Sequence, residues 1–375
     1  MKKIKLLYGI GSSGGGTLKN VADLATHLDR KSFEVFVAMS KKKHIKDTEV
    51  AISKMKNSNI DINYIHIAEK ISLTDIVSFF KIYSFLNRHK FDIVHAHSSK
   101  AGALFRLAAF WAKVPVVVYT PHCFYFTACK GIKRQFYRFL ECLLTRITHQ
   151  IVISGTEQKA AEECKIRKEK ISIIDNGIDC NEYIRPTFSS AMYKAINIPF
   201  NHTVIIGVGR LVRQKNWEMF IDIAEIVISK NKEITFLITG DGPCRKRLLK
   251  RISRSGLDAH IKLIGYVENI STIYSIADVF VSTSKWEGLP YTYLEASYFK
   301  IPMIITYTDG IEYFIQKGDS YIILESKLNF ARRILETIPN HPNNLSANRS
   351  FPFTLAECIK RYEALYQTLL ELCTK

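Results

Sequence analysis

The sequence predicts an α/β protein with two Rossmann-like domains, each built on a parallel sheet. Three observations lead to this fold class. The chain has 375 residues, of which 47% are hydrophobic, and this is enough to bury two cores of ordinary size. Short apolar runs alternate with helical patterns through both halves, as they do in parallel α/β domains. A polar stretch marked by Gly177 and Pro186 separates the halves and indicates a linker.

Strands are predicted where a short apolar run is bounded by turn residues. In the first half these runs lie near residues 4–8, 33–39, 62–67, 91–96, 115–119, 150–154 and 171–174. In the second half they lie near residues 203–208, 234–239, 261–264, 278–282, 302–306 and 320–324. A polar stretch then precedes a helix predicted over about 354–373. We therefore expect a first domain at residues 1–180, a second at 181–352 and a closing helical segment at 353–375.

The amino terminus resembles a secretory signal only superficially. Its apolar part is short, and Gly9 to Gly16 occupies the place of a cleavage region, so we interpret it as the first strand. No run approaches the roughly 18 to 20 apolar residues that span a bilayer. The eight cysteines are scattered, without a Cys-x-x-Cys pair. This spacing predicts free thiols in a reducing cytoplasm and no structural metal.

Positive charge is concentrated in the first half of the chain. The net charge is +18, and residues 1–180 contain 29 Lys and Arg against 16 Asp and Glu, a balance of +13. Residues 131–150 could form a helix that combines an apolar stripe with the basic residues Lys133, Arg134, Arg138 and Arg146. Such a helix can lie in an anionic membrane interface, but the same stripe could also pack on its own domain. Both interpretations stay open.

Two acids, Glu287 and Glu295, lie in the second half with seven residues between them. A predicted strand leads to a turn that contains Glu287, and a helix predicted over residues 291–299 carries Glu295. Carboxylates accept paired hydrogen bonds from vicinal hydroxyls, so two of them suit a ligand with two sugars, such as a nucleotide-sugar. The alternative is a capping acid followed by a solvated helix acid.

An anion site is predicted before this acid pair, because cations follow another strand. Gly207-Val208-Gly209-Arg210 ends an apolar run, and Gln214-Lys215-Asn216 comes shortly after it. Open α/β sheets bind ligands at such strand-to-helix crossings, and Arg and Lys beside a helix start favour an anion. Gly240-Asp241-Gly242-Pro243 and Gly265-Tyr266-Val267 follow at the ends of the next two predicted strands.

The first half contains a competing motif. The run from Gly9 to Gly14 fits the dinucleotide-binding pattern G-x-G-x-x-G, which alone would indicate an NAD(P)-dependent oxidoreductase. That fold needs an acid after the second strand, whereas this strand ends in Ser40-Lys41-Lys42, which could suit only a 2′-phosphate. A different role is that Gly14-Gly15-Gly16 leaves backbone amides open for a phosphate at a helix start.

Histidines follow the middle strands of the first half. His95-Ala96-His97 ends one strand, and His122 follows the next. A His-x-His pair suits zinc, but no third ligand has suitable spacing, so we expect no metal. The basic charge could also suit nucleic acid, but the chain has no aromatic-basic RNA motif and no recognition helix, so we expect no nucleic acid partner.

Taken together, in this order and spacing, the motifs resemble the retaining glycosyltransferases of family 4, of the bacterial surface-polysaccharide type. The resemblance covers nearly the whole chain. It implies the GT-B architecture, in which two Rossmann-like domains face a central cleft. It also implies metal-independent, retaining transfer of a hexosyl or N-acetylhexosaminyl group from a nucleotide-diphosphate sugar, with a UDP-sugar favoured, to a lipid-linked glycan. No cofactor is implied, and the expected location is the cytoplasm at the inner face of the plasma membrane.

The expected catalytic residues follow from the charge that develops during transfer. Breaking the anomeric bond places negative charge on the leaving diphosphate, and fixed positive charge must meet it there. Arg210 and Lys215 are the candidates. The resemblance implies that Glu287 binds hydroxyls of the transferred sugar and that His122 bonds the sugar near the reacting carbon. A nucleotide-sugar epimerase of the same architecture stays open as an alternative.

The resemblance also implies residues that bind the donor and the acceptor. Glu295 is expected to bind the ribose. The full set on the donor side is Gly15, Gly16, Gly209, Tyr266, Val267, Leu289, Tyr291, Thr292 and Glu295. The expected acceptor side is His97, Ser98 and Lys100. One departure from the family pattern is Pro290, which has no amide hydrogen, so backbone contacts at this turn must come from its neighbours.

Overall fold

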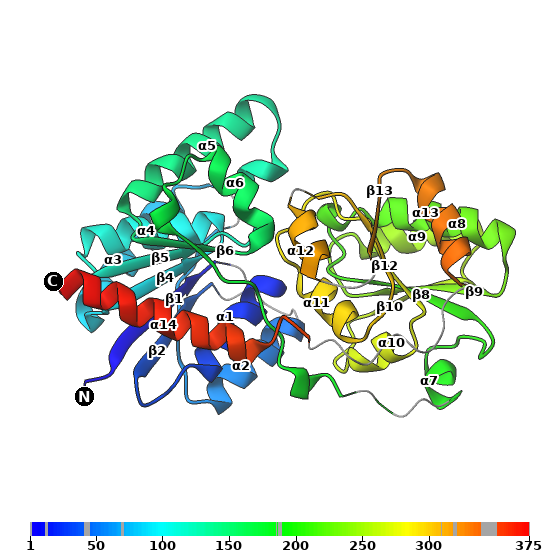
Figure 1. Cartoon of the computed structure of the whole chain (residues 1–375), viewed down its shortest axis with the longest axis horizontal. Coiled ribbons are helices and arrows are strands. Elements are labelled where there is room, and N and C mark those ends of the chain that lie inside the picture. The colour runs from blue at the N-terminus through cyan, green and yellow to red at the C-terminus, as the bar shows by residue number, and fades with distance from the viewer. Residues whose placement is uncertain are drawn as a thin grey trace. The chain divides into compact units, whose positions relative to one another are not determined.

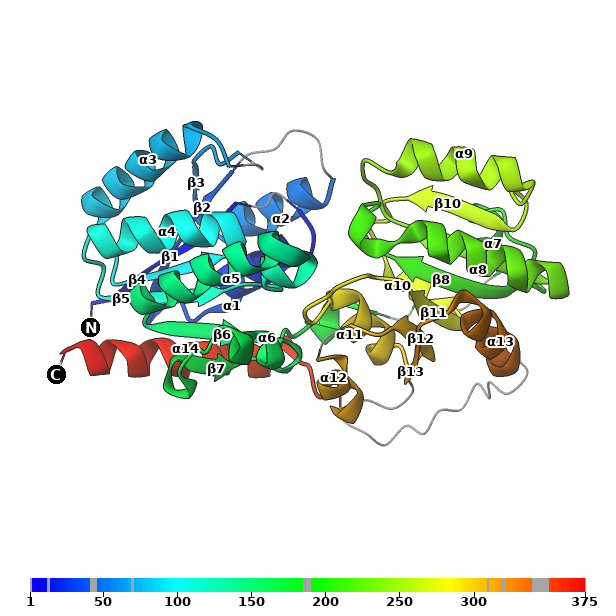
Figure 2. The ribbon, with the colours of Figure 1, turned by 90° about the horizontal axis from the view of Figure 1, so that it is seen from above.

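The structure is a computed structural model that describes residues 2–11, 14–40, 46–68, 71–184, 186, 190–308, 310–317, 321–338 and 351–374. The chain forms two compact units (Figures 1 and 2). The first unit comprises Met1–Gly177 with Leu355–Lys375, and the second comprises Ile178–Thr354. Each is built on a parallel sheet with helices on both faces. This confirms the predicted fold class.

The first unit contains a seven-stranded sheet in the order β3-β2-β1-β4-β5-β6-β7. Its strands overlap the seven predicted runs and are β1 (Ile4–Ile10), β2 (Phe33–Met39), β3 (Asp61–Tyr64), β4 (Ile93–His97), β5 (Val116–Thr120), β6 (Gln150–Ile153) and β7 (Ile171–Ile173). Every residue of the central strands β4, β5 and β6 is buried. Strands covered on both faces need apolar side chains at successive positions, and this explains their continuous apolar runs.

Helices cover the two faces of this sheet. One face is packed by α1 (Gly16–His27), α2 (Lys46–Asn57) and the closing helix α14 (Leu355–Thr374). The other face is packed by α3 (Thr74–His89), α4 (Ser99–Trp111), α5 (Gly131–Leu144) and α6 (Gln158–Glu163). Figure 1 shows this separation, with α14 on one side and α3, α4 and α5 on the other.

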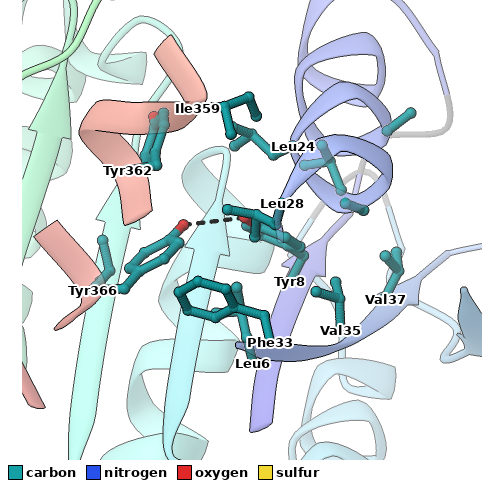
Figure 3. Packing of buried hydrophobic residues seen from close by; sticks show 14 of the residues in the cluster. Leu6, Tyr8, Leu24, Leu28, Phe33, Val35, Val37, Ile359, Tyr362 and Tyr366 are labelled. Atoms are coloured by element: carbon teal, nitrogen blue, oxygen red, sulfur yellow. Dashed lines mark hydrogen bonds between the residues drawn. The ribbon is translucent and has the colours of Figure 1, made fainter. Parts of the chain in front are cut away.

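The closing helix α14 is part of the first core. Its Ile359, Tyr362 and Tyr366 pack with side chains from α1, β1 and β2 (Figure 3). The hydroxyls of Tyr366 and Tyr8 lie 3.2 Å apart and form a buried hydrogen bond. Burying each large apolar side chain is worth about 1.5 to 3 kcal/mol, so this helix stabilises the first unit despite its distance along the chain.

The second unit contains a six-stranded parallel sheet in the order β10-β9-β8-β11-β12-β13. Its strands are β8 (Thr203–Val208), β9 (Ile234–Thr239), β10 (Ile261–Gly265), β11 (Val279–Ser282), β12 (Met303–Thr306) and β13 (Tyr321–Leu324). Its helices are α7 (Ser190–Ala195), α8 (Trp217–Lys230), α9 (Arg245–Ser255), α10 (Ser271–Ser275), α11 (Tyr291–Tyr298), α12 (Ile311–Lys317) and α13 (Lys327–Thr337). The face with α8, α9 and α13 opposes the face with α10, α11 and α12.

Both sheets reverse their strand order beside the first strand of the unit. The reversal lies between β1 and β4 in the first sheet and between β8 and β11 in the second. Connections leave such a point in opposite directions, which opens a crevice at the carboxyl ends of the strands. The motifs singled out in the sequence lie at these two positions.

Candidate active site

Two glycines shape the carboxyl end of β8. A side chain at Gly240 would place its Cβ only 2.0 Å from the carbonyl oxygen of Gly209, and the φ of Gly240 is 135°. A side chain at Gly209 would place its Cβ 3.0 Å from Cε of Lys215. Glycine at both positions therefore lets the β9 loop approach the end of β8 and lets the Lys215 side chain lie beside it.

Lys215 and Glu287 form an ion pair, which we call the lysine–acid pair. Nζ of Lys215 lies 2.7 Å from Oε1 of Glu287, and the side chains are 15% and 8% exposed. Gln214 supports the turn by donating from Nε2 to the carbonyl oxygen of Trp286, at 2.8 Å. The structure thus brings together two predicted site residues from separate motifs. Removing either one leaves the other partly buried and without its counter-charge.

The backbone around both predicted cations is held by side chains. The hydroxyl of Thr283 donates to the carbonyl oxygen of Lys215 at 2.9 Å, and the indole N–H of Trp217 donates to that of Arg210 at 2.9 Å. The side chain of Arg210 is exposed, and its guanidinium forms no hydrogen bond or ion pair with other residues that the structure describes. Arg210 is therefore available to an anion, whereas Lys215 is already oriented by Glu287.

Glu295 has a different environment from Glu287. It lies on α11 and is 6% exposed. The hydroxyl of Tyr183 donates to Oε1 at 2.7 Å, and that of Tyr274 donates to Oε2 at 2.8 Å. Burial, followed by the charge of Glu295, raises the pKa of Tyr274 well above its usual value, so this hydroxyl remains a donor. The ribose contact of Glu295 stays a prediction.

The sequence analysis did not predict Tyr183, Tyr274 or Arg245 as site residues. Tyr183 lies 112 residues before Glu295, and no motif connects them. Nη1 of Arg245 is buried without a hydrogen bond to the described residues, and it lies 3.5 Å from where a Cβ on Gly265 would be. The position of Arg245 directly after the loop that begins at Gly240 was a signal that could have identified it.

The other predicted donor residues differ in exposure. Tyr266 and Val267 follow β10 and are half-buried. Leu289 and Tyr291 are buried in the core of the second unit, so their predicted donor contacts would have to use the backbone. Oγ1 of Thr292, in the first turn of α11, is buried and has no hydrogen-bond partner among the described residues.

Three histidines gather in the first unit, and we call them the histidine cluster: His95, His97 and His122. Nδ1 of His97 lies 2.9 Å from Nε2 of His122, because β4 and β5 are paired and end side by side. His95 uses both ring nitrogens, with Tyr366 Oη at 2.7 Å and Thr120 Oγ1 at 2.8 Å. Its nitrogens are thus engaged by hydroxyl groups of the protein.

Burial controls the charge of the cluster. It lowers the pKa of His95 and His97 well below the usual value, and the neighbouring imidazoles lower it further. Burial also lowers the pKa of His122 to about 3. All three rings are therefore neutral at pH 7, and each carries a proton on one nitrogen.

The three predicted acceptor-side residues lie in different environments. His97 is 0% exposed and contacts His122, and its predicted acceptor contact stays a prediction. Ser98 has a φ of 62°, and its amide donates to the carbonyl oxygen of Thr120. Nζ of Lys100 lies 2.7 Å from Oδ1 of Asp75, so its charge is compensated within the first unit.

The glycines at the end of β1 and directly after it are explained by packing. A Cβ on Gly9 would lie 2.4 Å from the ring of Phe105, and one on Gly11 would lie 2.8 Å from Cβ of Ala101. Both contacts come from α4, which could not approach β1 if these residues had side chains. Gly15 has a φ of 72°, and α1 begins at Gly16. The other residues of this competing motif, Ser12 and Ser13, and the basic strand end Lys41-Lys42 lie outside the described residues.

Comparisons with known proteins decide the family. The model described as Glycosyltransferase Family 4 matches residues 14–182, and that described as Glycosyl transferases group 1 matches residues 191–349. The UDP-Gal:alpha-D-GlcNAc-diphosphoundecaprenol alpha-1,3-galactosyltransferase of Escherichia coli is 33% identical over 278 residues, which cover 70% of this chain and 71% of that protein. The chain belongs to glycosyltransferase family 4. It is therefore an enzyme of sugar transfer, and the oxidoreductase interpretation of the first glycines is wrong.

Further similarities extend over nearly the whole enzyme. The capsular polysaccharide biosynthesis glycosyltransferase CapM of Staphylococcus aureus is 24% identical over 92% of both chains. The solved structure of Anabaena HepE with UDP and glucose has a TM-score of 0.79 at 19% identity, covering 97% of this chain and all of that one. At this identity the structural match supports the fold, and it confirms the expected GT-B class.

The histidine cluster predicts a loss of stability in acid. The folded pKa of each ring is depressed, so below the ordinary value of about 6.5 the unfolded chain binds more protons than the folded one. The stabilisation from the neutral rings is fully present above pH 6.5. Below that pH the free energy of unfolding falls by up to about 1.4 kcal/mol per pH unit for each ring.

Urea unfolding between pH 7.5 and 5 measures this effect. Below pH 6, His97→Gln should make the free energy of unfolding less dependent on pH by the contribution of one histidine, about 1.4 kcal/mol per pH unit. His66→Gln, at an exposed position, is the matched control and should leave the slope unchanged. An identical slope in wild type and His97→Gln would show that His97 is not held neutral by the fold.

Proposed function

We propose that the enzyme transfers a hexosyl or N-acetylhexosaminyl group from a UDP-sugar to a lipid-linked glycan, in the synthesis of a bacterial surface polysaccharide. The lysine–acid pair carries this proposal, because it joins Lys215, which follows β8 together with the exposed Arg210, to Glu287, the acid predicted to bind the sugar. The names of the relatives support the substrate classes: UDP-Gal and a diphosphoundecaprenol-linked sugar for the E. coli enzyme, and capsule synthesis for the S. aureus protein.

The proposed reaction retains the anomeric configuration and needs no metal ion. The acceptor hydroxyl attacks the anomeric carbon on the face that the diphosphate leaves, and the electron pair of the broken C–O bond goes to the diphosphate. The proton of the acceptor hydroxyl passes to the departing phosphate oxygen. Arg210 and Lys215 meet the developing negative charge, which is the task that a divalent cation performs in other transferases.

Purified enzyme incubated with UDP-, GDP- and ADP-sugars tests the reaction class. Slow hydrolysis of one donor without added metal supports transfer, because water can replace the acceptor. Interconversion of the sugar without its release would instead support a nucleotide-sugar epimerase. Product stereochemistry, measured by NMR on an acceptor glycan, tests retention.

We further propose that the first unit docks on an anionic membrane, and helix α5 carries this proposal. Four apolar side chains of α5 repeat at helical spacing and point outward: Ile132 is 90% exposed, Phe136 51%, Phe139 64% and Leu143 47%. A stripe that packed on its own domain would be buried, so the packing alternative weighed in the sequence does not hold for these four residues.

A polar anchor explains why α5 faces this way. Its Glu141 points inward and lies 2.7 Å from Nη1 of Arg106, which is 0% exposed and stacks 3.6 Å from the ring centre of Tyr119. A buried Arg needs its counter-charge, so breaking this pair would be costly. The pair therefore holds the acidic side of α5 against the core and leaves the apolar stripe outside.

Neighbouring helices extend the same outward face. Exposed large apolar residues also occur on α3 and α4, which cover the same side of the sheet as α5: Ile76, Val77, Phe80, Leu107, Phe110 and Trp111. Apolar exposure over three helices is more than scattered surface residues provide, and with a basic excess it suits an anionic lipid surface. No helix in the described ranges is long and apolar enough to cross a bilayer.

The first prediction from this proposal concerns the diphosphate site. Lys215→Ala should lower kcat by roughly 10² or more, because a preorganised charge is lost. Lys230→Ala, at the far end of α8, makes the same charge change and should be neutral. Added chelator should have no effect, and strict dependence on Mg²⁺ would contradict the metal-independent route.

The ion pair requires a second variant, because Lys215→Ala also strands the carboxylate of Glu287. The double variant Lys215→Ala with Glu287→Gln removes that stranded charge. If Lys215 serves the diphosphate, the double variant is slower than Glu287→Gln alone. Equal turnover in the double variant and in Glu287→Gln would show that Lys215 acts only as a counter-ion for Glu287.

Another prediction separates the two acids by calorimetric binding. Glu295→Gln should weaken binding of both the UDP-sugar and free UDP, since both contain the ribose. Glu287→Gln should weaken binding of the UDP-sugar alone. Tyr183→Phe removes one hydrogen bond to Glu295 and should follow the Glu295 pattern more weakly, by about 1 kcal/mol. Equal losses of free UDP in the Glu287 and Glu295 variants would contradict this division.

Membrane docking is tested with vesicles of increasing anionic lipid content. Binding should rise with the anionic fraction and fall with salt, because exposed charges are screened over roughly 10 Å at 0.1 M. Lys133→Gln with Arg138→Gln should lower binding about 30-fold, at about 1 kcal/mol for each charge. Arg134 is a weaker target, since both oxygens of Glu163 already accept hydrogen bonds from it.

The apolar stripe has its own matched variants. Phe136→Ser with Phe139→Ser should lower binding to anionic vesicles, whereas Leu328→Ser, exposed to 66% on α13, should not. Donor hydrolysis in solution should persist in all of these variants. Vesicle binding that does not change with salt would contradict docking through α5. An equal loss of vesicle binding in Leu328→Ser would contradict it as well.

A further inference from the structure

The hydrogen bond between His97 and His122 can run in either direction, and its direction decides what His122 presents to a substrate. Two neutral imidazoles joined in this way share one proton between Nδ1 of His97 and Nε2 of His122. If His97 donates, His122 keeps its own proton on Nδ1, which is then a donor. If His122 donates, its Nδ1 is a bare acceptor.

The far nitrogen of His97 distinguishes these two arrangements. Nε2 of His97 is buried and forms no hydrogen bond to any residue that the structure describes. When His97 donates through Nδ1, this nitrogen is bare. When His122 donates, the proton of His97 lies on Nε2 and becomes a buried N–H without an acceptor. Buried N–H groups without partners are rarer than incompletely bonded acceptors, so donation by His97 is favoured.

The surroundings keep both rings in place. The ring of His97 lies 4.1 Å from that of His95, which Tyr366 and Thr120 hold through its two nitrogens. His122 has a φ of 52°, and Oε1 of Glu157 accepts a hydrogen bond of 2.6 Å from the amide of the next residue, Cys123. A left-handed backbone at a residue other than glycine persists only where its surroundings hold it. The ring and the backbone of His122 are thus each restrained by a buried partner.

We infer that His97 is a positioning residue that holds His122 as the Nδ1–H tautomer, so that His122 acts on the donor sugar as a hydrogen-bond donor and not as a base. Nδ1 of His122 has no hydrogen bond within the described part of the chain, and the residue is only partly buried. This inference rests on the proposed function, in which His122 bonds the transferred sugar as the family resemblance implies. A donor at this position would bind a sugar hydroxyl or phosphate oxygen without removing a proton from it.

The tautomer can be measured directly in the wild-type enzyme. Long-range proton–nitrogen NMR of protein labelled with ¹⁵N-histidine separates protonated from bare ring nitrogens, and loss of signals in His122→Asn assigns the ring. A protonated Nδ1 and a bare Nε2 in His122 are the expected result. A protonated Nε2 in His122 would overturn the inference. This measurement does not depend on activity or on the folding of a His97 variant.

Substitutions of His97 test its effect on turnover. Partners that orient a functional histidine are worth roughly 10- to 100-fold in metal sites, and we expect about 10-fold loss of kcat in His97→Leu. His97→Gln supplies a side-chain amide that can donate to His122, so it should restore most of kcat and keep the Nδ1–H tautomer. His97→Leu should show a mixture of both tautomers. Equal kcat in the Leu and Gln variants, with an unchanged His122 spectrum in both, would contradict the positioning role.

The inference and the proposed function fail in different ways. If His122→Ala keeps full turnover, the proposed contact of His122 with the sugar is wrong, whatever the tautomer. If His122→Ala is slow and wild-type His122 carries its proton on Nε2, the proposed function stands and the inference alone is rejected.

Discussion

Close packing at the carboxyl ends of the central strands is the constraint on which both groups of candidate residues depend. Gly240 meets the carbonyl of Gly209 so closely that no side chain fits between them, and Gly9 and Gly11 admit α4 against β1 in the same way. Lys215 and Glu287 lie in the loops that follow β8 and β11, and the histidine cluster lies at the ends of β4 and β5. The packing of the strand ends therefore positions both groups.

Tyrosine hydroxyls form hydrogen bonds with buried polar side chains in each unit. Tyr366 from the closing helix bonds to His95, and Tyr183 and Tyr274 bond to Glu295. Buried polar groups without partners are costly, so each tyrosine stabilises the core and fixes the side chain that it bonds to. Removal of α14 would take away apolar packing on β1 and the hydroxyl that holds His95.

Helix α5 shows that periodicity and orientation are separate properties. The sequence pattern identifies an amphipathic helix, and that pattern is the same whether the apolar stripe faces the core or the solvent. The direction is set by Arg106, a fully buried cation on α4 that requires Glu141. This charge pair, together with the inward packing of Tyr137 and Cys142, holds α5 with its stripe exposed, and the basic residues around the stripe become meaningful only once that direction is known.

The fold class, nearly all strand positions and the family could be predicted from the amino-acid pattern, because these depend on local apolar patterns and on motifs that are contiguous in the chain. Lys215 and Glu287 could also be identified, each from its own motif. The folded chain was needed to show that these two form an ion pair, that Glu295 bonds to two tyrosines, and that His97 lies buried against His122. Each of these contacts joins residues far apart in the chain, so their pairing depends on strand order and register, which no local pattern encodes.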